Sequence, residues 1–196
     1  MWLKFVFDRT VSFLALLLLW PVIAILALLV RIVMPDGSPF FVQTRIGRGG
    51  KPFKVIKFRT MRTDPSDPAP VPGLVAALRR YKLDELPQLW NVLTGDMSFV
   101  GPRPDLPGYA DALEGEDREI LALRPGITGP ASLKYRDEEL ILAAQPDPLK
   151  YNDEVIWPDK VRINRYYLHH YSFLTDIRLI LATVFRRHLT YGGEVI

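Results

Sequence analysis

The chain has 196 residues, of which 48% are hydrophobic and 24% are charged, and its formal net charge is +3. This composition excludes a disordered tail, a collagen-like fibre and a disulfide-stapled mini-protein. The absence of cysteine excludes a thiol nucleophile and a cysteine-based zinc site, and three histidines are too few for a histidine-rich metal centre. Any chemistry must therefore come from carboxylates, arginines, lysines and hydroxyl groups.

The charge is unevenly distributed along the chain. Residues 1–64 contain ten basic and three acidic side chains, whereas the remainder is slightly acidic. A basic N-terminal third indicates an anionic partner, such as lipid headgroups or nucleotide phosphates, although a solubilising surface would have the same composition. We expect no binding to nucleic acid, because these basic residues flank an apolar segment instead of alternating with aromatic ones.

That apolar segment is residues 10–30, which contain no charged side chain. A helix of this length rises about 30 Å, the thickness of the hydrocarbon core of a membrane. A cleaved signal peptide is a poor match, because the run is long and no small-residue cleavage site follows it. The segment is therefore predicted to lie in a membrane.

Pro21 lies at the centre of this segment and leaves two topologies open. A kinked helix that spans the membrane is the ordinary outcome for such a proline. The alternative is a re-entrant hairpin of two half-helices whose ends return to the same face. The charges favour the hairpin, because Lys4 and Arg9 precede the run, Arg31 follows it, and positive charges prefer the cytoplasmic side.

The rest of the chain predicts an α/β fold, rich in helix and with irregular loops. Alternating apolar and polar residues on both sides of Gly47–Gly50 predict a small β-hairpin. A proline-rich loop is expected between Pro65 and Pro72, and further turn-rich loops in the middle of the chain. Helices are expected over three ranges, namely residues 73–81, 85–93 and 160–189.

The last of these helices has apolar residues at helical spacing. It could cover the core of the domain, or it could lie in the membrane interface with its arginines toward the headgroups. The apolar positions are Phe173, Ile177, Ile180, Leu181 and Val184.

Two adjacent acidic residues, Asp84 and Glu85, open the helix predicted for residues 85–93. The apolar residues Leu83, Leu86, Trp90 and Leu93 follow at steps of three and four and predict its buried face. In one interpretation Asp84 is simply the helix cap. In the other, the two carboxylates point about 100° apart, so that one attacks phosphorus while its neighbour holds a divalent cation.

Four segments occur in a fixed order, and together they resemble the monotopic phosphoglycosyl transferases, the bacterial sugar transferase family. The resemblance covers nearly the whole chain and points to the small members that consist of the catalytic part alone, similar to undecaprenyl-phosphate phosphosugar transferases. The segments are Lys57–Met61 (KFRTM), Leu83–Leu93 (LDELPQLWNVL), Gly95–Pro104 (GDMSFVGPRP) and Arg124–Gly129 (RPGITG).

The resemblance implies transfer of a phosphosugar from a nucleotide diphosphate sugar, usually a UDP-sugar, to a polyprenol phosphate. This reaction releases UMP and begins glycan assembly on a membrane, as in exopolysaccharide or lipopolysaccharide synthesis. Asp84 matches the nucleophile, which forms an aspartyl phosphosugar and gives ping-pong kinetics. Glu85 matches the partner acid associated with Mg²⁺.

The resemblance also implies cations that bind the substrate phosphates, although each could be an ordinary surface ion pair when considered alone. These are Lys57, Arg59, Arg79, Arg103 and Arg136. Pro21 matches the residue that makes the membrane segment re-entrant. Residues 1–34 are then the hairpin. Residues 35–196 are a catalytic domain on the cytoplasmic face of the bacterial inner membrane, with an interfacial C-terminal helix.

The chain departs from the usual family pattern at three places. Lys82 stands where serine is common, and Trp20 precedes Pro21 where serine is frequent. Pro130–Arg136 reads PASLKYR in place of the more common aromatic-Ala-Gln-Val-x-Gly-Arg. The rival interpretation is a non-catalytic, membrane-anchored module that recruits glycan enzymes, in which Asp84 is only a helix cap.

Overall fold

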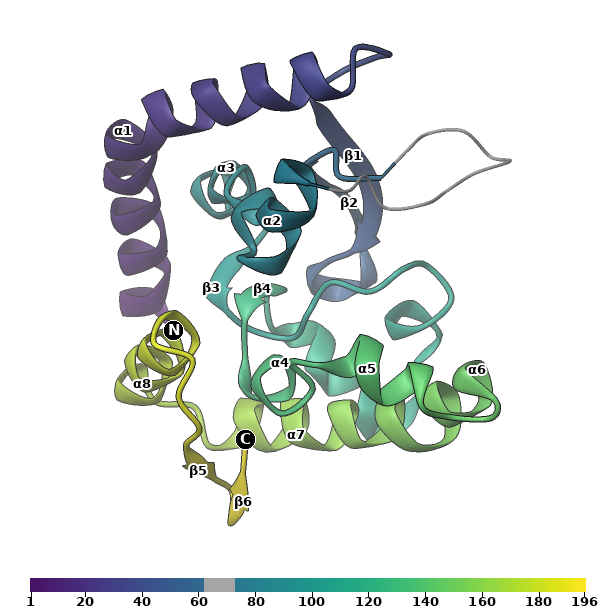
Figure 1. The fold of residues 1–196 in the computed structure, drawn as a ribbon. Helices are drawn as coiled ribbons and strands as arrows, with labels where there is room; N and C mark the ends of the chain where they lie inside the picture. The colour runs from purple at the N-terminus through teal and green to yellow at the C-terminus, as the bar shows by residue number, and fades with distance from the viewer. Residues whose placement is uncertain (62–72) are drawn as a thin grey trace. The chain divides into compact units, whose positions relative to one another are not determined.

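The computed structural model describes residues 1–61 and 73–196, so the proline-rich loop predicted between Pro65 and Pro72 lies outside the described residues. Helices predominate and the sheets are small, which confirms a helix-rich fold with short strands (Figure 1). The chain forms two compact units. The first comprises Met1–Arg45 and Phe53–Met97, and the second comprises Ile46–Pro52 and Ser98–Ile196.

The apolar segment of the first unit forms one long helix, α1 (Trp2–Val33). It is long and apolar enough to cross a membrane, and almost none of its most apolar stretch is buried. Figure 1 shows α1 as two arms that meet at a sharp bend, and Pro21 lies inside the helix. Proline removes one backbone hydrogen bond and clashes with the preceding turn, which is a common cause of such bends. The re-entrant topology stays a prediction.

The predicted hairpin is present as β1 (Phe40–Ile46) and β2 (Pro52–Phe58), joined by the short 3₁₀ turn η1 (Arg48–Gly50). Gly49 and Gly50 have φ angles of +72° and +76°. A left-handed backbone of this kind favours glycine, because a Cβ atom would crowd the neighbouring peptide groups. The two glycines therefore explain why the chain reverses here.

The helix predicted for residues 73–81 is α2 (Leu74–Arg80), but the one predicted for residues 85–93 begins later than expected. Its first residues form a separate 3₁₀ turn, η2 (Leu83–Glu85), and the α-helix proper is α3 (Gln88–Thr94). The predicted buried face is also wrong, because Leu83 and Trp90 are exposed. The 3₁₀ turn has about three residues per turn instead of 3.6, and it therefore changes which residues of α3 face the core. Leu89 and Val92 are buried instead.

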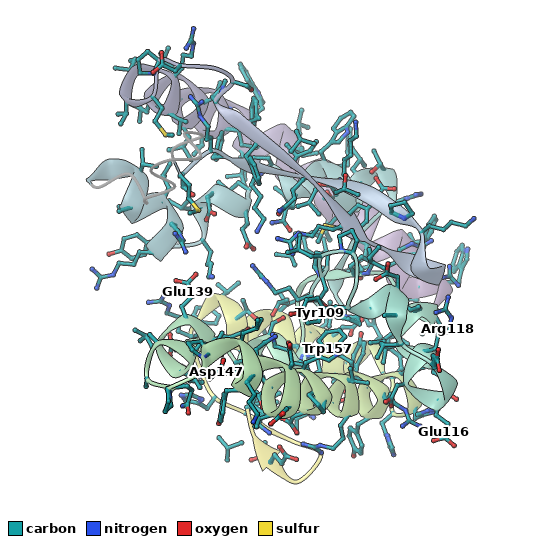
Figure 2. The ribbon with its side chains drawn as sticks, turned by 90° about the vertical axis from the view of Figure 1, so that its right-hand side faces the viewer. Tyr109, Glu116, Arg118, Glu139, Asp147 and Trp157 are labelled. Atoms are coloured by element: carbon teal, nitrogen blue, oxygen red, sulfur yellow. The ribbon has the colours of Figure 1, made fainter. Side chains whose placement is uncertain are left out.

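The second unit is built around the parallel strands β3 (Ser98–Val100) and β4 (Gly126–Thr128). Tyr109 lies edge-on to Trp157, with ring centroids 5.4 Å apart, and Figure 2 shows the two side chains together. The helical segments of this unit are η3 (Ala110–Ala112), η4 (Gly115–Ala122), α4 (Pro130–Lys134), α5 (Glu138–Ala143), α6 (Pro148–Tyr151), the π-helical η5 (Asn152–Ile156), α7 (Trp157–His169) and α8 (Phe173–Val184).

Three glycines allow the backbone of this small sheet to close up. A Cβ atom on Gly101 would overlap the carbonyl oxygen of Arg124, and one on Gly126 or Gly129 would overlap the main chain of Gly101. The amide of Gly101 donates to the carbonyl of Thr128 at 2.9 Å. The GPRP and RPGITG motifs are therefore two sides of one tightly packed backbone unit.

The single helix predicted for residues 160–189 is wrong, because α7 and α8 are separate and Ser172 caps the second helix. A hairpin of β5 (Thr190–Tyr191) and β6 (Glu194–Val195), which was not predicted, follows them. Leu181 and Val184 are exposed while Asp176 is buried, so these two apolar residues do not cover the core, and the interfacial alternative stays a prediction. Tyr167 donates a hydrogen bond to Asp176, so the buried face of α8 includes an acidic residue that the apolar pattern leaves out.

Gly126→Ala should destabilise the fold by about 3 kcal/mol, because the new methyl group would overlap backbone atoms that cannot move aside. Gly49→Ala is the control, because no atom of the described residues lies within 4 Å of a Cβ there, and its positive φ opposes a side chain at a cost of about 1 kcal/mol. Thermal unfolding in detergent measures both changes. Equal losses of stability would contradict the close approach of β3 and β4.

Candidate active site

The two adjacent acids lie on a short bridge between helices of the first unit. Lys82, with a φ of +58°, precedes the 3₁₀ turn Leu83–Glu85, which we call the acidic turn. Backbone hydrogen bonds continue from this turn into α3, from the amide of Leu86 to Leu83, from Leu89 to Leu86 and from Trp90 to Pro87. The acidic turn is thus attached to α3 without an intervening loop.

Asp84 is buried, with 8% of its surface exposed. Its Oδ1 atom has no hydrogen-bond partner among the residues that the structure describes. The N-cap positions of η2 and α3 are Lys82 and Pro87, and neither helix start in this described segment has a side-chain cap bond. The interpretation of Asp84 as a helix cap is therefore wrong.

Burial raises the pKa of Asp84 to about 6, and the neighbouring charge of Glu85 adds to the effect. Lys57 and Lys82 act in the opposite direction, because positive charge favours the carboxylate. Keeping this carboxylate ionised at neutral pH costs on the order of 3 kcal/mol of folding free energy. A buried acid with an unpaired oxygen and a perturbed pKa is more typical of a functional site than of a structural one.

Glu85 is also buried, and a lysine from the hairpin reaches it. The Nζ atom of Lys57, on β2, lies 3.1 Å from Oε1 of Glu85. The structure therefore brings together two of the predicted site residues from segments 28 positions apart. Lys57 and Lys82 thus both bring positive charge to the two carboxylates of the acidic turn.

Arg59 contacts main-chain groups in this structure. Its guanidinium is buried and donates to the carbonyl of Met34 at 2.6 Å and to that of Asp36. It thereby fixes the chain just after the end of α1. These bonds use two of the five N–H donors of the guanidinium, and Nε of Arg59 has no hydrogen-bond partner among the described residues, so the predicted phosphate contact stays a prediction.

The three remaining arginines are divided between the units. Arg79, in the last turn of α2, is half-buried and belongs to the same unit as Asp84. Arg103 is exposed and Arg136 is half-buried, and both belong to the second unit. Arg136 donates to the carbonyl of Arg187 at 3.4 Å. Their contacts with substrate phosphates stay predictions.

Sequence reasoning missed Asn91, which joins α3 to β2. Its side chain is buried, its Nδ2 donates to the carbonyl of Lys54 at 2.7 Å, and its Oδ1 accepts from the amide of Ile56 at 3.2 Å. This pair of bonds fixes α3 beside the strand that carries Lys57. The available signal was an asparagine between apolar neighbours in a helix, where a buried amide needs partners.

The acidic turn fits a magnesium ion that substrate would help to bind. Mg²⁺ prefers carboxylate oxygens and is usually held by one or two of them, together with water and substrate phosphates. Asp84 and Glu85 supply two neighbouring carboxylates, and Oδ1 of Asp84 is unpartnered within the described ranges. In residues 1–61 and 73–196 there is no group of three histidine or acidic side chains that could hold a metal without such help.

Comparison with known proteins supports the family resemblance of the sequence over almost the whole chain. The family model described as "Bacterial sugar transferase" matches residues 1–189. The exopolysaccharide production protein PSS of Rhizobium leguminosarum bv. phaseoli is 37% identical, over 93% of this chain and 93% of that protein. The uncharacterized sugar transferase EpsL of Bacillus subtilis is 35% identical, over 93% of this chain and 85% of EpsL.

A longer relative is similar over the same region. The UDP-glucose:undecaprenyl-phosphate glucose-1-phosphate transferase of Escherichia coli is 36% identical over 91% of this chain, which corresponds to 39% of that protein. The acidic turn, its lysine from the hairpin and the paired glycine motifs lie inside the matched region. The chain belongs to the bacterial sugar transferase family.

Proposed function

We propose that this protein transfers a phosphosugar from a nucleotide diphosphate sugar, most simply a UDP-sugar, to a polyprenol phosphate. The products are a polyprenol diphosphosugar and UMP. The names of two relatives support the reaction, namely the E. coli protein above and a putative undecaprenyl-phosphate N-acetylgalactosaminyl 1-phosphate transferase of B. subtilis. The observation that carries the proposal is the buried carboxylate oxygen of Asp84, which has no hydrogen-bond partner among the described residues.

Asp84 is the nucleophile in this proposal. A carboxylate oxygen attacks the phosphorus that bears the sugar, and the bond from that phosphorus to the bridging oxygen breaks, so that UMP leaves with the electron pair. An oxygen of the polyprenol phosphate then attacks the same phosphorus and restores the Asp84 carboxylate. A carboxylate is already ionised at neutral pH, so the first step needs no general base.

The remaining site residues bring positive charge to a reaction between anions. Glu85 would hold Mg²⁺, which when bound neutralises the diphosphate of the donor. Lys57 lies beside Glu85 and is within reach of the same turn. The phosphates are proposed to contact four arginines, Arg59, Arg79, Arg103 and Arg136. Arg59 in addition holds the main chain after α1.

The membrane acceptor agrees with the apolar surfaces of the protein. We propose that residues 1–34 enter the membrane as a re-entrant hairpin from the cytoplasmic face of the bacterial inner membrane. Helix α8 is proposed to lie in the interface, because it has exposed apolar and basic residues together. The exposed apolar side chains are Leu174, Leu181, Val184 and the following Phe185, and the exposed basic ones are Arg178, Arg186 and Arg187.

Asp84→Asn should abolish release of UMP from the donor, because the amide is a poor nucleophile. A coupled assay of UMP release in detergent or membrane vesicles measures the rate. Asp137→Asn, at an exposed aspartate in the second unit, removes the same charge and should retain the full rate. Near-native release by the Asp84 variant would contradict the proposal, and absence of turnover in the unmodified protein would favour the recruiting module.

The rate of UMP release should fall as the pH is lowered through about 6, because the raised pKa of Asp84 means that its carboxyl becomes protonated there. The dependence of kcat/KM on pH reports groups of the free enzyme, and we expect an acidic limb near this value. Thermal unfolding over the same pH range separates loss of activity from loss of structure. A rate that is constant down to about pH 5 would show that Asp84 is not the titrating nucleophile.

Single cysteines at both ends of α1 should be labelled from the same side of the membrane. The chain has no native cysteine, so Trp2→Cys and Pro35→Cys give unambiguous positions, both exposed. A membrane-impermeant maleimide should modify both in inverted vesicles and neither in intact cells. Labelling from opposite sides would establish a spanning helix and contradict the re-entrant hairpin.

A further inference from the structure

We propose that the N-terminal arm of α1, residues 2–12, positions the active site through Ser12 and Arg9. These side chains bind carbonyl oxygens of α3, the helix to which the acidic turn is attached. The proposal rests on the proposed function, since it concerns the geometry of the Asp84 carboxylate. Ser12 and Arg9 are positioning residues, because they act on the site through α3.

Ser12 makes a directed contact in the middle of an apolar sequence. Its side chain is fully buried, and its Oγ donates to the carbonyl oxygen of Leu89 at 2.5 Å. A hydroxyl placed among apolar groups without a partner would cost free energy, and this carbonyl supplies the partner. Leu89 is five residues from Asp84, so the bond is made close to the acidic turn.

Arg9 holds the other end of the same helix. Its Nη2 donates to the carbonyl of Thr94, the last residue of α3, at 2.9 Å, and its guanidinium lies 4.0 Å from the centroid of the Phe5 ring. A cation at this end complements the negative end of the helix dipole. Gly95 leaves room for the contact, since a Cβ atom there would overlap the guanidinium.

The opposite side of α3 is already fixed to the hairpin. Asn91 bonds to β2 at Lys54 and Ile56, next to the Lys57 that pairs with Glu85. A helix of only seven residues is not stable by itself and takes its position from its neighbours. The α1 arm on one side and β2 on the other therefore determine where the acidic turn lies.

This arm differs from what a lipid anchor alone requires. Lys4, Asp8 and Ser12 follow at intervals of one helical turn and are all buried, although they are polar. In a pure anchor, alanine would serve at least as well as serine at position 12, because alanine is less costly to insert in a membrane. Membrane binding and catalytic geometry should therefore respond differently to substitution at this position.

The test is Ser12→Ala in the full-length protein, assayed for UMP release with a UDP-sugar donor and a short polyprenol phosphate. We expect kcat to fall by about tenfold or more with the KM for the donor unchanged, because a misplaced nucleophile affects the reaction more than ground-state binding. Ser12→Thr keeps a hydroxyl and should restore kcat. Thr10→Ala removes an exposed hydroxyl from the same arm and should leave kcat unchanged.

A second variant keeps the proposal testable if Ser12→Ala folds poorly. Arg9→Gln should also lower kcat at unchanged KM, and the combined loss with Ser12→Ala should be less than the product of the two, since both act on α3. The amount of membrane-bound protein and its unfolding temperature are measured for each variant. Unchanged kcat in both variants would overturn the proposal, as would a loss accounted for entirely by detachment or unfolding.

The outcomes also separate this inference from the proposed function. If neither the unmodified protein nor Asp84→Asn releases UMP, the proposed function fails. If the unmodified protein is active, Asp84→Asn is inactive and Ser12→Ala retains full kcat, only the positioning role fails.

Discussion

Two carboxyl groups placed side by side and away from water repel each other and lose their hydration, and the arrangement of the first unit counteracts both effects. Lys57 arrives from the hairpin to pair with Glu85, and Asn91 holds that strand against α3. Arg59 fixes the chain between α1 and the hairpin through two carbonyl groups. Lys57, together with Lys82, favours the ionised form of Asp84 in a site where burial and the charge of Glu85 oppose it.

Several elements could be predicted because their signals are local. The apolar run predicted a helical membrane segment interrupted at Pro21, which is the bent helix α1, and the glycines between positions 47 and 50 predicted the hairpin. The start of α3 could not be predicted, because the same residues fit either a capped α-helix or the 3₁₀ turn that follows the left-handed backbone of Lys82. The separation of α7 from α8 was missed for a similar reason, since the buried bond between Tyr167 and Asp176 pairs residues that the apolar pattern treats as unrelated.

The site was predicted unevenly for the same physical reason. Asp84 and Glu85 stand together in the sequence, so their proximity needed no tertiary information, and the ion pair with Lys57 followed once the hairpin formed. Arg59 and Ser12 bind backbone carbonyl oxygens, and such a bond does not depend on which amino acid supplies the oxygen. Any residue offers a carbonyl oxygen, and so composition and spacing cannot reveal which one is used.

The backbone of Lys82 has a consequence for how this site can change. A φ of +58° is strained for lysine by about 1 kcal/mol, and glycine would remove that strain. Glycine would also remove the ammonium group that favours ionisation of Asp84. Replacing Lys82 with glycine would thus stabilise the loop and make Asp84 harder to ionise. A variant selected only for thermal stability would therefore be active over a narrower pH range.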